Sequence, residues 1–262
     1  MTNPLAQLKH IGPGLVIAAT GLGAGDLIAA SVAGAKFGTT ILWAAVLGAI
    51  MKYAMNEGLT RWQLATGTTL LEGWVQRLPK FISIYFFIYL LAWSFIVAGA
   101  LIAGSGIAAH ALFPALSLEQ WGILHSLLAL VLVLIGRYSL LEKLMKLFMG
   151  LMLLVVLICA VLVAPDLSEI FRGLLMPSVP EGSVIFIFSV IGGVGGSVTL
   201  LCYCYWIRER DWNKRTDMQR SRVDLAVAYI LTGLFGIAIM IISAGVHPDV
   251  MTGPNMALAV AG

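Results

Sequence analysis

Residues 11–37 of this chain read IGPGLVIAATGLGAGDLIAASVAGAKF. The stretch is apolar and long enough to cross a bilayer, for which about 20 residues suffice. Its middle contains three glycines, Gly21, Gly23 and Gly25, and one carboxylate, Asp26. Glycine frees backbone carbonyls from helical hydrogen bonding, and at membrane depth such groups are tolerated only inside protein or along a polar cavity. We therefore interpret this stretch as a broken helix that carries half of an ion site.

The composition defines the broad class of protein. Of 262 residues, 60% are hydrophobic and 11% are charged, and the mean hydropathy is +0.96. These values exclude a soluble globular domain and predict an all-α integral membrane protein in a lipid bilayer. The net charge of +3 is small and scattered, so no nucleic-acid partner is expected. The apolar spans contain no cluster of His, Cys and acidic residues with catalytic or zinc-binding spacing, so we expect neither an enzyme nor a cofactor.

Seven candidate transmembrane spans follow from the apolar segments. They cover residues 11–35, 40–56, 81–110, 121–136, 145–165, 183–206 and 223–245. With the N-terminus in the cytoplasm, thirteen Lys and Arg residues fall inside and two, Lys36 and Arg172, fall outside. This asymmetry predicts a cytoplasmic N-terminus, and we expect a multi-pass protein of a prokaryotic inner membrane.

The sixth span, residues 183–206, is interrupted like the first. Gly192, Gly193, Gly195 and Gly196 precede two hydroxyl side chains, Ser197 and Thr199. Two broken helices in corresponding halves of a chain indicate a binding site between structural repeats. The alternative is a tight glycine seam between two packed helices.

Charged residues near the ends of the spans have simpler interpretations. Glu57 and Arg61 stand one helical turn apart and predict an interfacial ion pair, while Lys52 can extend toward the interface. Residues 207–224, IRERDWNKRTDMQRSRVD, form the most charged segment and are expected to be a solvated cytoplasmic connector. A further helix begins within residues 247–262, which predicts a chain that is incomplete at its C-terminal end.

Several segments together resemble the Nramp family of divalent-metal transporters. They are GPGLVIAATGLGAGDLIAASVAGAKFG, ILW, RWQLATG and GSGIAAHALF, which begin at Gly12, Ile41, Arg61 and Gly104. The resemblance implies a LeuT-type fold of inverted five-helix repeats whose first and sixth helices are discontinuous. Residues 1–262 would be a single transmembrane transporter domain, with the first repeat in 1–165 and an incomplete second repeat in 183–262.

The motifs that hold the metal in this family differ here. The family's DPGN motif in the first helix corresponds to residues 23–26, so that its Asp position is Gly23 and its Asn position is Asp26. The MPHN motif of the sixth helix corresponds to residues 196–199, GSVT, and its Met and His are replaced. Acidic residues of the third helix fall on Ala98 and Leu101, so proton coupling of the family's usual kind is not expected.

These departures predict a site built of oxygen atoms. Its ligands would be the Asp26 carboxylate, carbonyls near Gly23 and Gly196, and the hydroxyls of Ser197 and Thr199. Such a set favours hard cations such as Mg²⁺, Ca²⁺ and Mn²⁺. The thiol of Cys202 would add a soft ligand if it turned into the cavity, and the alternative is a buried structural thiol.

The leading hypothesis is a secondary transporter that moves a divalent metal cation by alternating access, with the metal as cargo and not as cofactor. A second hypothesis keeps the fold and changes the cargo to an amino acid carried with Na⁺. A third is a non-transporting membrane subunit or a degenerate paralogue. The residues indicate neither the coupling ion nor the oligomeric state.

Overall fold

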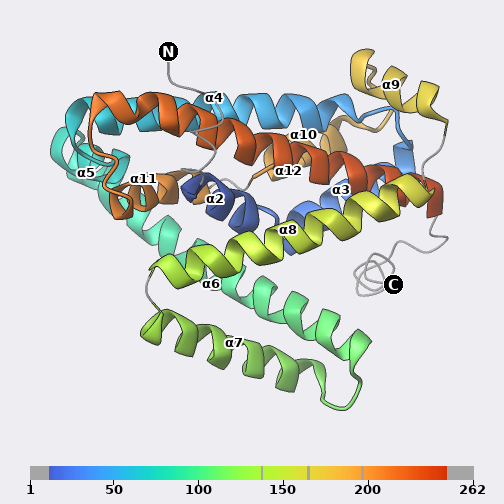
Figure 1. The fold of residues 1–262 in the computed structure, drawn as a ribbon, viewed down its shortest axis with the longest axis horizontal. Coiled ribbons are helices and arrows are strands. Elements are labelled where there is room, and N and C mark those ends of the chain that lie inside the picture. The colour runs from blue at the N-terminus through green and yellow to red at the C-terminus, as the bar shows by residue number, and fades with distance from the viewer. Residues whose placement is uncertain (1–11, 137, 164–165, 196–197, 247–262) are drawn as a thin grey trace.

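The computed structural model describes residues 12–136, 138–163, 166–195 and 198–246, and these are almost entirely helical (Figure 1). The helices are α2 (Pro13–Gly21), α3 (Ala24–Phe37), α4 (Trp43–Thr66), α5 (Leu70–Arg77), α6 (Lys80–Leu112), α7 (Leu118–Ile135), α8 (Tyr138–Val163), α9 (Leu167–Leu175), α10 (Val184–Gly193), α11 (Thr199–Glu209), the 3₁₀ turn η2 (Arg215–Asp217) and α12 (Met218–Val246). Each of the seven predicted spans is therefore represented by helix.

Among the described residues, four helical stretches are apolar and long enough to cross a bilayer unaided. They are Lys80–Leu112, Leu118–Ile135, Ser139–Val163 and Arg215–Gly245, and the α2–α3 pair, bent by 59°, is a fifth candidate. This confirms the prediction of an all-α integral membrane protein.

The second span runs beyond its predicted end at residue 56, and its helix continues to Thr66. The charge of Glu57 does not end the helix, because Arg61 pairs with it at 2.7 Å.

The first and sixth spans are both interrupted, as predicted. Helix α2 ends at Gly21 and α3 begins at Ala24, while α10 ends at Gly193 and α11 begins at Thr199. The two interruptions are in contact, because a β-carbon added to Gly21 would lie 2.7 Å from the Cα of Gly195. Gly195 has φ of +74°, a conformation that glycine adopts without strain. Glycine thus allows both the interruption of the helices and the close approach of their two backbones.

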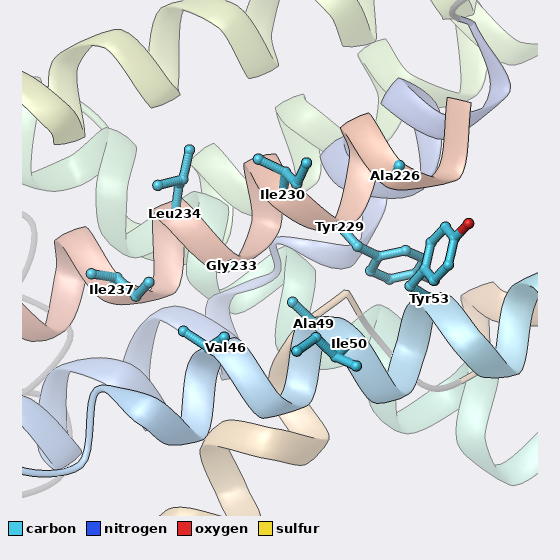
Figure 2. Close-up of a pocket in the computed structure, with 10 residues that line it drawn as sticks. All are labelled: Val46, Ala49, Ile50, Tyr53, Ala226, Tyr229, Ile230, Gly233, Leu234 and Ile237. Atoms are coloured by element: carbon cyan, nitrogen blue, oxygen red, sulfur yellow. The ribbon is translucent and has the colours of Figure 1, made fainter. Parts of the chain in front are cut away.

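Helix α12 is the central element of the fold. It packs against α2, α3, α4 and α8, and Figure 1 shows it crossing the molecule between α4 and α8. An apolar groove of about 330 Å³ runs between α4 and α12, with Tyr53 and Tyr229 at one end (Figure 2). Helices α6 and α7 pack mainly against each other and leave most of their apolar side chains exposed, as expected of lipid-facing segments.

A buried carboxylate on α12 holds the start of α2. The two Asp224 oxygens accept the backbone N–H groups of Gly12 at 2.9 Å and Gly14 at 2.6 Å, and the hydroxyl of Tyr203 donates to Asp224 at 2.9 Å. The first N–H groups of a helix have no partner within it, and a carboxylate satisfies them and complements the helix dipole. Asp224 therefore joins α2, α11 and α12 into one unit.

Most of residues 207–224 are exposed, as expected of a solvated connector, but part of the segment is docked against the helices. Trp212 is buried, and three arginines of this segment form ion pairs with acidic residues of α4, α5 and α8. The pairs are Arg208–Glu72 at 2.6 Å, Arg210–Glu142, and Arg222–Glu57 at 2.9 Å. All three arginines belong to the side of the membrane that the sequence predicts to be cytoplasmic. These contacts tie α4, α5 and α8 to the end of α11 and the start of α12 at one pole of the molecule.

We predict that Gly21→Ala destabilises the protein by about 1–3 kcal/mol, because the added methyl group meets the backbone of Gly195 and overpacked sites cost this much. Thermal unfolding of the detergent-purified protein measures the effect. Gly25→Ala is the matched control, since nothing lies within 4 Å of a β-carbon there. Equal melting temperatures for the two variants would contradict the contact between the breaks.

The Glu72–Arg208 pair predicts a pH dependence of stability. The hydrogen bond from Arg208 lowers the pKa of Glu72 from 4.5 to about 2. A carboxylate with a lowered folded-state pKa contributes stability above its ordinary pKa, and this contribution is lost as the pH falls toward the folded value. We expect Glu72→Gln to be less stable than the wild type at neutral pH, with a difference that shrinks between pH 4.5 and about 2. Unfolding measured across this pH range tests the prediction, and the exposed Glu181→Gln is the control for loss of a charge. A stability difference between wild type and Glu72→Gln that stays constant with pH would contradict the role of the pair.

Candidate cation site

Asp26 lies where the two interrupted spans meet. It is in the first turn of α3, and one of its oxygens accepts the backbone N–H of Gly23 at 3.2 Å. The other faces the end of α10, because a β-carbon added to Gly193 would lie 2.9 Å from Asp26 Oδ1. The carboxylate thus caps one half-helix and points toward another.

A small cavity of about 20 Å³ opens beside this carboxylate. Its lining comes from three segments: the first half of α3 with Leu22 in the break before it, the end of α10 with the residue that follows it, and the middle of α12. The residues are Leu22, Asp26, Ala30, Val190, Gly193, Val194, Thr232, Phe235 and Gly236. A volume of roughly 10–15 Å³ on this measure accommodates one water molecule. The cavity therefore matches a single water molecule or a single dehydrated ion.

The electrostatics around the cavity favour a cation. Helix α10 ends at Gly193, and the last carbonyls of a helix lack intrahelical partners and carry partial negative charge. They add to the charge of Asp26. On α4, the buried ammonium of Lys52 interacts electrostatically with Asp26 and offsets part of this charge. Within the described part of the chain, no group of three or more His, Cys, Asp or Glu side chains could hold a metal.

The other predicted ligands are placed differently. The Gly23 carbonyl accepts the N–H groups of Asp26 at 3.1 Å and Leu27 at 3.2 Å, so it already begins the hydrogen bonding of α3. Thr199 starts α11 and donates its hydroxyl to Gly195 at 3.3 Å, and it does not line the cavity. Gly196 and Ser197 lie outside the described residues. The thiol of Cys202 is also absent from the lining.

Sequence reasoning missed two contributors to the cavity. In the sequence analysis, Gly193 is placed in the break but not in contact with Asp26, and Thr232 is not singled out. A signal for Thr232 was available, since it is the one aliphatic hydroxyl within residues 225–236, LAVAYILTGLFG, a run that is apolar apart from Tyr229 and Thr232. Polar groups inside a membrane span usually face the protein interior or a cavity.

The fold and the site define a multi-pass membrane protein in which two interrupted helices converge on one buried carboxylate. The family model described as natural resistance-associated macrophage protein-like, Nramp, matches residues 14–258. The chain belongs to the Nramp family.

Curated relatives and solved structures agree with this assignment. The divalent metal cation transporter MntH of Yersinia pestis is 24% identical, over 92% of this chain and 60% of the relative. MntH of Chromohalobacter salexigens is also 24% identical, over 90% of this chain and 56% of the relative. The manganese transporter of Eremococcus coleocola, solved with an aromatic bis-isothiourea compound, superposes with a TM-score of 0.71 at 15% identity, covering 99% of this chain and 60% of that one. This similarity confirms the LeuT-type fold, and the chain spans about 60% of the length of these proteins.

We predict that Gly193→Ala weakens Mn²⁺ binding with little loss of stability. The added methyl group would displace the end of the Asp26 side chain, which can rotate away, so the carboxylate moves and the fold persists. Titration of Mn²⁺ into the purified protein measures the change. The control is Gly192→Ala, because nothing lies within 4 Å of a β-carbon at that position. If Gly193→Ala binds Mn²⁺ with the same affinity as the wild type, Asp26 does not belong to a metal site.

Proposed function

We propose that this protein transports a divalent metal cation across the membrane by alternating access, with the cation bound between α3 and α10. The observation that carries the proposal is the Asp26 carboxylate facing the C-terminal end of α10 across a cavity of ionic size. Half-helix C-termini and unwound carbonyls are the groups that bind cations in transporters with broken helices. The MntH relatives are named as divalent metal cation transporters, which supports the same cargo here.

The position of Asp26 gives an energetic reason for cation binding. A charged side chain at the centre of a membrane helix costs about 2.5–3.5 kcal/mol on insertion scales. A bound cation offsets this cost because it neutralises the carboxylate where water is largely excluded. Lys52 supplies part of the compensation, so a divalent ion must compete with a protein ammonium.

The cavity chemistry supports a preference for hard cations. Its lining residues include Asp26 and Thr232, whose side chains carry oxygen, and none of them carries sulfur. Oxygen ligands suit Mg²⁺, Ca²⁺ and Mn²⁺, whereas thioether and thiolate ligands select softer ions. Ala98 and Leu101 of α6 carry no carboxyl group, so the proposal includes no proton coupling through that helix.

The proposal extends to orientation and domain structure. The two interrupted spans occupy corresponding places in residues 1–165 and 183–262, which supports a complete first repeat and the start of a second. The pole that collects Arg208, Arg210 and Arg222 would face the cytoplasm, with the N-terminus on the same side of a prokaryotic inner membrane.

The size of the cavity weighs against an amino acid as cargo. A space of about 20 Å³ holds one small ion or water molecule, and an amino acid has several times as many heavy atoms. An amino acid would also place its carboxylate near Asp26. Competition of transport by amino acids but not by divalent ions would favour that alternative, and a purified protein that binds no ion would favour a non-transporting subunit.

We predict that Asp26→Asn abolishes Mn²⁺-dependent thermal stabilisation and Mn²⁺ uptake into proteoliposomes, because the amide retains the shape but not the charge. Asp166→Asn is the matched control, since Asp166 also accepts a backbone N–H at a helix start, at 3.1 Å, but is exposed. In the wild type, Mn²⁺, Mg²⁺ and Ca²⁺ should compete better than Cd²⁺. Uptake retained by Asp26→Asn would refute the proposed site.

A further inference from the structure

Thr232 is one of the residues that line the cavity beside Asp26. It belongs to the middle of α12, its exposure is 1%, and it lines the same space as Asp26, Gly193 and Val194. Helix α12 therefore contributes to the cavity together with the two interrupted spans. This hydroxyl is the second polar side chain in the lining, after the carboxylate of Asp26.

The hydrogen bonding of Thr232 leaves its oxygen able to bind a cation. The hydroxyl donates its proton to the carbonyl of Tyr229, one turn earlier, at 3.2 Å. A hydroxyl has one donor and two acceptor lone pairs, so donation leaves both lone pairs available. Hard cations bind such oxygens readily.

The neighbouring turn of α12 holds Thr232 in place. The ring of Tyr229 packs against Gly195, where an added β-carbon would lie 2.7 Å from Cε1 of the ring. Asn56 of α4 donates to the Tyr229 hydroxyl at 3.1 Å, and Tyr229 lies at the end of the groove between α4 and α12 (Figure 2). The Tyr229 side chain, one turn before Thr232, is thus held by the sixth span on one side and α4 on the other. Such support orients a ligand before the ion arrives.

We propose that Thr232 is a cation ligand, and that the metal site is completed by α12 in addition to the two interrupted spans. The inference rests on the proposed function, since it needs a cation beside Asp26. It adds a neutral oxygen from a third segment, which raises the coordination number without adding charge. An ion bound there would join α3, α10 and α12, the last of which also holds the start of α2 through Asp224.

The test compares Thr232→Val with Thr232→Ser. Valine keeps the shape and removes the oxygen, whereas serine keeps the oxygen and removes a methyl group. Calorimetric titration of Mn²⁺ into the purified full chain should show binding weakened about tenfold or more by Thr232→Val and within about threefold of wild type for Thr232→Ser, the tenfold loss corresponding to about 1.4 kcal/mol.

Thr60→Val is the matched control for removal of a buried hydroxyl. Thr60 is fully buried on α4, and its hydroxyl also donates to a carbonyl one turn earlier, that of Asn56, at 2.8 Å. It does not line the cavity. Thermal unfolding of both valine variants separates loss of stability from loss of binding, and Thr60→Val should bind Mn²⁺ as the wild type does.

The outcomes distinguish this inference from the proposed function. If Asp26→Asn abolishes Mn²⁺ binding while Thr232→Val binds like Thr60→Val, the site stands and the role of Thr232 is overturned. If Thr232→Ser weakens binding as much as Thr232→Val, the oxygen is not the cause and the inference is also overturned. If Asp26→Asn binds Mn²⁺ like the wild type, both proposals fail together.

Discussion

The fold depends on satisfying helix ends that lie inside the protein. Each interrupted span creates backbone N–H or C=O groups without intrahelical partners, at a depth where water is scarce. Asp224 of α12 receives the N–H groups at the start of α2, and Asp26 receives the N–H that precedes α3. The carbonyl end of α10 faces Asp26. The Asp224 carboxylate therefore stabilises the fold at the pole, whereas the Asp26 carboxylate lies where a cation can bind.

Close backbone contact converts these ends into a site. Gly21 and Gly195 let the two breaks touch, and the same junction places Asp26 beside Gly193. The ion pairs of residues 207–224 involve other residues, and they tie α4, α5 and α8 to the end of α11 and the start of α12. Small residues therefore shape the junction, whereas the three arginine ion pairs lie at the pole. Lys52 is the exception, since its ammonium interacts with the site carboxylate from α4.

The sequence predicted the seven spans, both breaks and the central position of Asp26, because glycine and a carboxylate within apolar runs are local signals. It did not predict the partners of Asp26. Gly193 and Thr232 lie 167 and 206 positions away, as the residue numbers show, and only the packing of α10 and α12 against α3 brings them together. The docking of residues 207–224 was missed for the same reason, since arginines in a polar loop look alike whether solvated or paired. The family resemblance predicted the fold correctly, but its motif positions do not identify Thr232.

An anomalous difference map from crystals soaked in Mn²⁺ tests the central claim most directly. The account predicts one peak at the junction of the two breaks, within ligand distance of an Asp26 oxygen and close to the carbonyl end of α10. A peak elsewhere in the membrane region, or Asp26 turned away from the sixth span with no peak beside it, would contradict the account.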